Sequence, residues 1–219
     1  MIKAVVYDMD GLFVDSESLQ TIAWNKFLKR YDHNIADVPM EVRNGFTGIR
    51  VIDGMIQINK ILKLGDNLGE LYNEREKIWI EIVKEELELM PGAIESLDFF
   101  RSKGMKIAIA SSGSDEYIEA ILDKFSLSDY FDVVVTGDCV KNGKPDPEPY
   151  AVACKKLDLD PRVCLVLEDA EKGVASAKEA GCKCIGIDNS DTPPQNLSRA
   201  DVELNSLCEI NQEVFDSIN

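Results

Sequence analysis

The chain has 219 residues, 45% hydrophobic and 29% charged, which is ordinary for a globular protein with one sizeable domain, or a core plus a smaller insert. Its 24 basic and 40 acidic residues give a net charge of −16, which repels nucleic acid and anionic lipid, so we expect neither as a partner. No segment approaches 18 uncharged apolar residues, and the N-terminus does not resemble a signal peptide, which predicts a cytoplasmic protein without membrane association. A monomer is the default expectation. The single histidine, His33, lies in the polar segment YDHN and gives no support to Ser-His-Asp or Cys-His catalysis.

The first part of the chain reads as one strand followed by helices. Residues 3–7 (KAVVY) form an apolar run rich in β-branched residues, which predicts a short buried strand. Apolar residues at helical spacing then predict a helix over residues 16–31, with Ser16 as its N-cap. Similar patterns predict helices at about 49–62 and 68–87, so this part of the chain is expected to be all-helical.

Helices and strands alternate after Pro91-Gly92, which interrupts the helical pattern. The predicted strands cover residues 106–110, 132–137, 163–167 and 183–187, and the predicted helices 93–103, 115–124, 147–157 and 170–180. The tail is expected to hold a short edge strand near Val202 and a last helix from about Ser206.

Alternating helices and near-continuous apolar strands predict an α/β fold with a doubly wound parallel sheet. The first strand belongs with this sheet, although the helical part of the chain separates it from the others. We therefore expect residues 1–15 and 90–219 to form a Rossmann-like core, and residues 16–89 to form an inserted all-α cap domain.

Polar residues follow four of the predicted strands, at the edge where an open parallel sheet binds its ligands. They are the segments Asp8–Gly11, Ser111–Ser114, Gly143–Pro145 and Glu168–Asp169. Each segment alone is equally well explained as a turn, a helix cap or a solvated loop. Their joint placement at successive strand ends favours one shared site.

The chemistry of this grouping is that of a phosphate site. Crowded carboxylates raise one another's pKa unless a cation compensates, and Mg²⁺ suits one or two carboxylates together with phosphate oxygens. Lys144 supplies a second positive charge, and Ser111 with the backbone N–H groups of a helix start forms an anion cradle. A carboxylate here can attack phosphorus to give an aspartyl phosphate, while a second carboxyl protonates the leaving oxygen.

Four segments resemble the ordered motifs of the haloacid dehalogenase-like superfamily, and most closely its β-phosphoglucomutase-like branch of sugar phosphatases. The segments are DMDGLFVDSE (8–17), ASSGS (110–114), GKPDPEPY (143–150) and VLEDAEKGVASAKEAG (166–181). The resemblance covers the whole chain, and the helical segment matches that branch's α-helical cap.

The resemblance implies a role for each matching residue. Asp8 would be the nucleophile and a Mg²⁺ ligand, and Asp10 the general acid/base whose backbone carbonyl also binds Mg²⁺. Ser111, assisted by the amide of Ser112, would bind the phosphoryl group, and Lys144 would neutralise it together with the nucleophile. Asp169 would be a Mg²⁺ ligand, and Glu168 either a ligand or a partner of the ligands. Because dehalogenases of the superfamily lack the second aspartate, Asp10 favours phosphoryl transfer.

The sequence also bears on hydrolysis versus mutase chemistry. The mutase's cap histidine is matched here by Gln20, and its cap lysine by Thr47. Both differences favour a phosphatase that hydrolyses a small phosphate monoester of a sugar or polyol. The alternatives are a phosphosugar mutase and a catalytically silent binding protein on the same fold.

Substrate contacts are expected from the cap, at Gln20, Arg50 and Arg75. Arg75 interrupts an apolar helical stripe, and the sequence leaves open whether it reaches into the cleft or extends to solvent. Arg50 either contacts substrate or stabilises its own turn. Trp24 is expected to pack in the core, and Arg43 to lie on the surface.

Overall fold

The computed structural model describes all residues, 1–219, and contains one six-stranded sheet in which every pairing is parallel. The strand order is β3-β2-β1-β4-β5-β6. The strands are β1 (Ala4–Tyr7), β2 (Lys106–Ala110), β3 (Val133–Val135), β4 (Cys164–Glu168), β5 (Lys183–Ile187) and β6 (Val202–Leu204). The chain builds outward from β1 first on one side and then on the other, so β1 marks the point where the strand order reverses. The predicted doubly wound fold is confirmed.

The pleat of the central strand divides the core between the two faces of the sheet. Val5 and Tyr7 join the larger cluster with side chains of α5 (Ala93–Ser102), α6 (Asp115–Phe125) and α9 (Gln212–Ile218). Ala4 and Val6 point the opposite way, toward α7 (Glu148–Lys156) and α8 (Glu171–Ala180). All four side chains are fully buried, which explains why this strand reads as a continuous apolar run.

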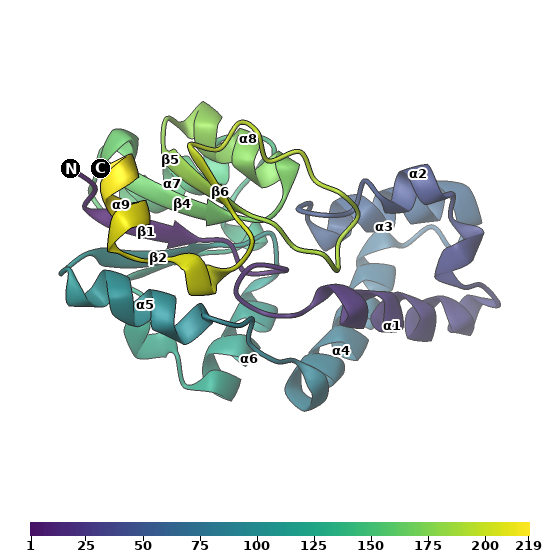
Figure 1. Ribbon diagram of the computed structural model, residues 1–219. Helices are drawn as coiled ribbons and strands as arrows, with labels where there is room; N and C mark the ends of the chain where they lie inside the picture. Colours follow the sequence, from purple (N-terminus) through teal and green to yellow (C-terminus); the bar gives the residue numbers. More distant parts are fainter.

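A helical block, which we define as α1 to α4, lies beyond the carboxyl ends of the strands (Figure 1). Its helices are α1 (Glu17–Leu28), α2 (Met40–Arg43), α3 (Val51–Leu62) and α4 (Leu68–Glu86). The block also contacts the core, because α4 packs on α6, where the rings of Trp79 and Tyr117 lie 5.3 Å apart. The block thus covers the sheet edge where the polar segments were expected.

The helix predicted over residues 16–31 ends earlier than expected, at Leu28, and a 3-10 turn follows it. Asp32 adopts a left-handed conformation with φ of 59°, and the N–H of His33 returns to the carbonyl of Leu28, an arrangement that terminates helices. Ser16 occupies the N-cap position, but its side chain makes no capping bond and donates to Asp10 instead.

Two other predicted elements are shorter than expected. The predicted strand 132–137 is reduced to β3, which ends at Val135 because Thr136 begins a 3-10 turn over Gly137–Cys139. The last helix begins at Gln212, not at Ser206, because Ser206 caps a separate 3-10 turn and Asn211 caps α9. The four-residue helix α2 was not predicted at all.

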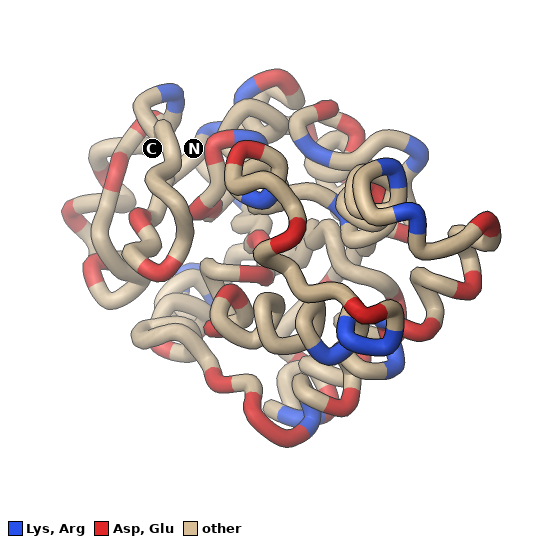
Figure 2. Tube along the Cα trace, turned by 90° about the vertical axis from the view of Figure 1, so that its right-hand side faces the viewer, with Lys and Arg blue, Asp and Glu red and all other residues tan.

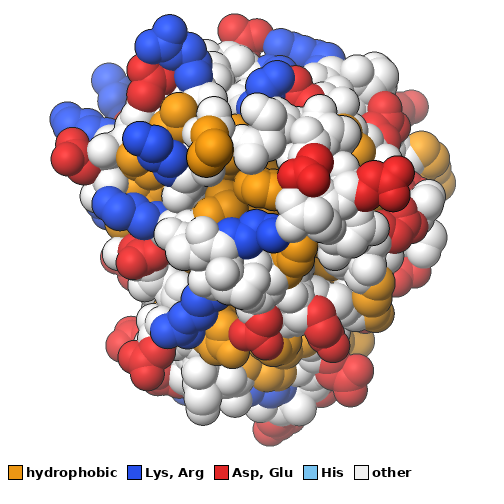
Figure 3. Space-filling view, turned by 60° about the vertical axis from the view of Figure 1, so that its left-hand side comes forward, with side chains coloured by type: hydrophobic (Ala, Val, Ile, Leu, Met, Phe, Trp, Pro, Cys, Tyr) orange, Lys and Arg blue, Asp and Glu red, His pale blue; other side chains and the backbone are white.

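The molecular surface is mixed in charge and only sparsely apolar. Acidic and basic positions both occur along the trace in Figure 2. On the face shown in Figure 3, hydrophobic side chains appear between charged ones. Over the whole chain, the large hydrophobic side chains that are well exposed are Met1, Ile22, Met40 and Ile61. None of the helices combines the length and the apolar character that crossing a membrane requires.

Candidate active site

Strand register brings the polar segments to one edge of the sheet. Tyr7 pairs with Leu167 of β4 on one side and with Ile109 of β2 on the other. The residues that follow these partners therefore emerge at the same level, which places Asp8 beside Glu168 and near the loop that begins at Ser111. Asp8 lies at the point where the strand order reverses, which is the usual ligand position in this type of sheet.

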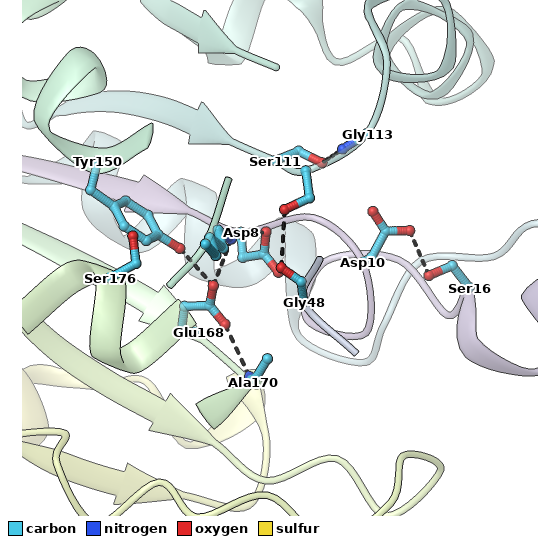
Figure 4. Close-up of polar contacts among 12 residues, drawn as sticks. Asp8, Asp10, Ser16, Gly48, Ser111, Gly113, Tyr150, Glu168, Ala170 and Ser176 are labelled. Carbon is cyan, nitrogen blue, oxygen red and sulfur yellow. Dashed lines mark hydrogen bonds and ion pairs between the residues drawn. The ribbon is translucent and has the colours of Figure 1, made fainter. Parts of the chain in front are cut away.

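Lys144 joins two buried carboxylates. Its Nζ lies 2.6 Å from Oδ1 of Asp8 and 2.6 Å from Oε1 of Glu168, and the lysine side chain is only 1% exposed. Glu168 is held further by the hydroxyl of Tyr150 at 2.7 Å and by the backbone N–H of Ala170 at 3.0 Å (Figure 4). Both carboxylate oxygens of Glu168 thus already accept hydrogen bonds from the protein.

Asp169 differs from its neighbour because both of its carboxylate oxygens are buried without a hydrogen-bond partner. One ligand atom each of Asp8, Glu168 and Asp169 lies within 4.8 Å of the others. Buried charges are normally paired or bound to metal, so this arrangement fits a hard divalent cation held by oxygen ligands. Gly11 leaves room for the carboxylate of Asp169, since a Cβ at residue 11 would lie 2.4 Å from its Oδ2.

The pKa shifts of these carboxylates and of Lys144 also indicate that the cluster lacks a positive charge. Burial, followed by the nearby charge of Glu168, raises the pKa of Asp8 to about 7 although Lys144 opposes the shift. Burial and the carboxylates of Glu168 and Asp8 raise the pKa of Asp169 well above its usual range. Burial alone would lower the pKa of Lys144, but Asp8 and Glu168 outweigh it and raise that pKa. One lysine therefore does not compensate these three carboxylates.

Asp10 lies in the same loop but is turned toward the helical block. Its Oδ1 accepts a hydrogen bond from the hydroxyl of Ser16 at 2.8 Å (Figure 4). It accepts another from the hydroxyl of Tyr117 at 2.6 Å. Burial raises the pKa of Asp10, and these two hydrogen bonds partly oppose the shift. A carboxyl group with a raised pKa beside a strand-end aspartate is suited to proton transfer.

Ser111 and Ser112 begin the turn that leads into α6. Ser111 is 2% exposed, and its Oγ accepts the N–H of Gly113 at 2.9 Å. The hydroxyl of Ser112 donates to the carbonyl of Gly48 at 3.1 Å, which connects this turn to the helical block. The backbone N–H groups at such a helix start favour an anion.

A cavity of about 330 Å³ lies over Asp8 and Asp10. Its walls come from α1, α4, the segment around residues 43–51, the turn before α6 and the loop after β5. The volume is at the small end of the range for ligand pockets, which suits a small metabolite. Of the cap residues expected to contact substrate, Gln20 and Arg50 lie in the wall.

Three arginines of the helical block, Arg43, Arg50 and Arg75, have different environments. Arg75 is fully buried behind the wall and does not extend to solvent. Arg50 binds Asp53 through Nε at 2.9 Å and also donates to the carbonyls of Val140 and Lys141 in the loop before Lys144. Arg43, expected at the surface, is half-buried in the wall, and its Nε is buried without a partner.

Sequence reasoning missed several residues of this site. Tyr150 lies in the segment GKPDPEPY, whose pattern suggests no role for it, although it is fully buried against Glu168. Tyr117 and Glu76 had no signal of their own, because they sit in ordinary amphipathic helices. Trp24, expected in the core, is indeed 93% buried, yet it also lines the cavity.

Comparison with known proteins identifies the family. Residues 5–187 match the model of the haloacid dehalogenase-like hydrolases. A phosphorylated carbohydrates phosphatase of Thermotoga maritima is 33% identical over 84% of this chain and 83% of its own length. Hexitol phosphatase A of Escherichia coli is 33% identical over 95% of this chain and 93% of its own length. The crystal structure of CbbY from Rhodobacter sphaeroides in complex with phosphate superposes with a TM-score of 0.85 at 25% identity, and covers 100% of this chain and 99% of that one.

The resemblance first seen in the four motifs is confirmed, because the match extends through the sheet and the helical block alike. The register of the strands brings those motifs into a single site, which contains the buried, unpartnered carboxylate of Asp169. The chain belongs to the haloacid dehalogenase-like hydrolase family.

Proposed function

We propose that this protein is a Mg²⁺-dependent phosphatase that hydrolyses a small monoester, a sugar or polyol phosphate, through an aspartyl phosphate on Asp8. The observation that carries the proposal is the buried carboxylate of Asp169, unpartnered beside Asp8 and the Lys144 ion pairs. The carbohydrate and hexitol phosphatases among the relatives support the same class of substrate.

The residues proposed to hold the metal are Asp8, Asp169 and the backbone carbonyl of Asp10. Glu168 would orient Lys144 instead, because both of its oxygens already accept hydrogen bonds. When bound, Mg²⁺ would neutralise charge on the transferring phosphoryl group.

In the proposed reaction, a carboxylate oxygen of Asp8 attacks phosphorus and the bond from phosphorus to the ester oxygen breaks. Asp10 gives its proton to that oxygen, and the alcohol leaves. Asp10 then accepts a proton from water, whose oxygen attacks phosphorus and releases phosphate from Asp8. Ser111 and Lys144 would hold the phosphoryl oxygens in both steps.

Residues 16–89 are proposed to act as a cap that closes over the site and excludes water. Polar contacts such as Ser112 with Gly48 and Arg50 with the carbonyl of Lys141 connect it to the core, and α4 also packs on α6 through Trp79 and Tyr117. In the structure Asp10 is directed to Tyr117 and Ser16, so its proposed role requires a turn of its side chain toward the substrate.

Removing the metal is expected to stop turnover. Purified protein would be treated with EDTA and assayed on sugar phosphates, polyol phosphates, nucleotides and p-nitrophenyl phosphate. We expect Mg²⁺ to restore free phosphate release, and Ca²⁺ to restore little because it favours looser, higher coordination. Full activity in EDTA would contradict the metal assignment. Phosphate that moves within the sugar without release would identify a mutase.

The stabilising effect of Mg²⁺ is expected to grow with pH. The pKa of Asp8 is about 7 in the folded protein against an ordinary value of 3.8, so between these values the folded state binds the extra proton. Stability of the metal-free protein should therefore fall as the pH rises through this window. We expect Mg²⁺ to raise the melting temperature by a few degrees more at pH 8 than at pH 5. Equal shifts at the two pH values would contradict the proposed ligands.

A further inference from the structure

The cavity wall contributed by α1 and α4 contains two polar side chains, Gln20 and Glu76. Both accept hydrogen bonds from a buried arginine, Arg75. Arg75 lies behind this wall with its guanidinium over the rings of Trp24, at 4.8 Å, and Trp79, at 5.2 Å. Its Nη1 donates to Oε1 of Glu76 at 2.9 Å, and its Nη2 donates to Oε1 of Gln20. Arg75 is 0% exposed and does not itself line the cavity, so it acts through these two side chains.

These contacts fix the hydrogen-bonding character of the wall. The carbonyl oxygen of Gln20 is occupied by a cation that only donates, so the amide NH₂ of Gln20 remains as a free donor. Oε2 of Glu76 already accepts the hydroxyl of Ser114 at 2.8 Å, but each carboxylate oxygen has a further acceptor site. The wall therefore presents one oriented donor and one oriented, negatively charged acceptor.

A hydroxyl group is the natural complement of this pair. It accepts from Gln20 and donates to Glu76, whereas a phosphate or carboxylate group has no hydrogen to donate. Glu76 is 94% buried and paired with Arg75, so its charge is balanced within the wall, and its carboxylate offers an anion no hydrogen to accept. A site built to bind a hydroxyl rejects analogues that leave its buried groups unpaired.

The remaining charges of the wall favour a substrate that is neutral apart from its transferred phosphate. Arg50 is paired with Asp53 by two hydrogen bonds, of 2.9 and 3.2 Å. Asp191 adds negative charge, Glu17 does so only in part because burial raises its pKa to about 7, and the charge of Glu76 is balanced by Arg75. Arg43 is the one basic side chain of the wall without an ion pair. If the cavity instead favours a substrate with a second anionic group, Arg43 is the residue that would bind that group.

We propose that Gln20 and Glu76, positioned by Arg75, recognise a hydroxyl of the substrate and select neutral polyhydroxyl monophosphates against esters with a second phosphate or a carboxylate. The inference rests on the proposed phosphatase function and names specificity-determining residues within it. Glu76 and Gln20 are binding residues, and Arg75 is a positioning residue.

The test compares kcat/KM for a hexitol 6-phosphate, a sugar-acid phosphate and a hexose 1,6-bisphosphate, with p-nitrophenyl phosphate as the reference without aliphatic hydroxyls. We expect the wild-type protein to prefer the hexitol phosphate over both anionic esters by tenfold or more. Glu76→Gln should shrink that preference at least tenfold, because it keeps the shape and removes the charge. Gln20→Met should lower kcat/KM for the hexitol phosphate relative to the reference. Glu85→Gln, at an exposed position of the same helix, should change neither ratio.

Each failure has a distinct signature. A preference for the bisphosphate that disappears in Arg43→Gln would overturn the inference and leave phosphatase function intact. The inference is equally overturned if Glu76→Gln and Gln20→Met both keep the wild-type ratios. If Glu76→Gln does not fold, the wild-type ratios and Gln20→Met still decide. Absence of Mg²⁺-dependent turnover on every ester, including p-nitrophenyl phosphate, would refute the proposed function itself.

Discussion

Replacing Asp8 with asparagine is expected to abolish turnover while the fold persists. The amide cannot attack phosphorus, and loss of a covalent nucleophile costs on the order of 10⁴-fold or more in kcat. The melting temperature of the metal-free variant should not fall. Burial, followed by the charge of Glu168, raises the pKa of Asp8 to about 7. Removing the charge of Asp8 therefore relieves unfavourable burial and repulsion, which offsets the loss of one bond to Lys144.

The role of Asp8 as nucleophile can also be tested by trapping the phosphorylated protein, in addition to measuring the rate. Wild-type protein quenched with acid during turnover should carry phosphate on the peptide that contains Asp8, detectable by mass spectrometry. The Asp8→Asn variant should carry none. Asp66→Asn, at an exposed position in the helical block, should keep wild-type activity and labelling. Appreciable activity of Asp8→Asn, or label on another residue, would exclude Asp8 as the nucleophile.

The core of the site was predictable because parallel strands impose a common edge. Once KAVVY and VCLVL are recognised as parallel buried strands, Asp8 and Glu168 must emerge at the same edge of the sheet, and the pairing of β1 with β4 places them side by side. The loop containing Lys144 is less constrained, and its position could be inferred only from the chemistry that the carboxylates require. The same logic could not separate Glu168 from Asp169, since only the structure shows which one has its hydrogen bonds satisfied.

The side of the site formed by the helical block was not predictable to the same depth. Helical spacing identified the apolar stripe that Arg75 interrupts, but not the direction of its side chain. Arg75 is buried because Glu76, the next residue, and Gln20, 55 positions earlier, accept its hydrogen bonds. Such a network depends on how α1 packs against α4, and sequence periodicity carries no information about that contact. For the same reason Arg43 was expected at the surface.

Replacing Lys144 with methionine is expected to be both inactivating and destabilising. Lys144 is the only cation that bonds to Asp8 and Glu168, and all three side chains are at most 5% exposed. Removing one partner of a buried ion pair typically costs about 3–5 kcal/mol of stability, because the remaining charge stays buried and uncompensated. Loss of a charge that stabilises the transferring phosphoryl group should also lower kcat by about 10²–10³-fold.

The pH dependence separates this explanation from a simple packing defect. In metal-free protein, Asp8 with a pKa already near 7 takes up a proton readily once the lysine is gone, and a protonated carboxyl needs no counterion. The loss of unfolding free energy in Lys144→Met should therefore be larger at pH 8 than at pH 5, measured by urea unfolding in EDTA. Lys141→Met, at an exposed position of the same loop, should show wild-type stability at both pH values. A loss that is equal at the two pH values would mean that Lys144 contributes through packing of its aliphatic chain and not through its charge.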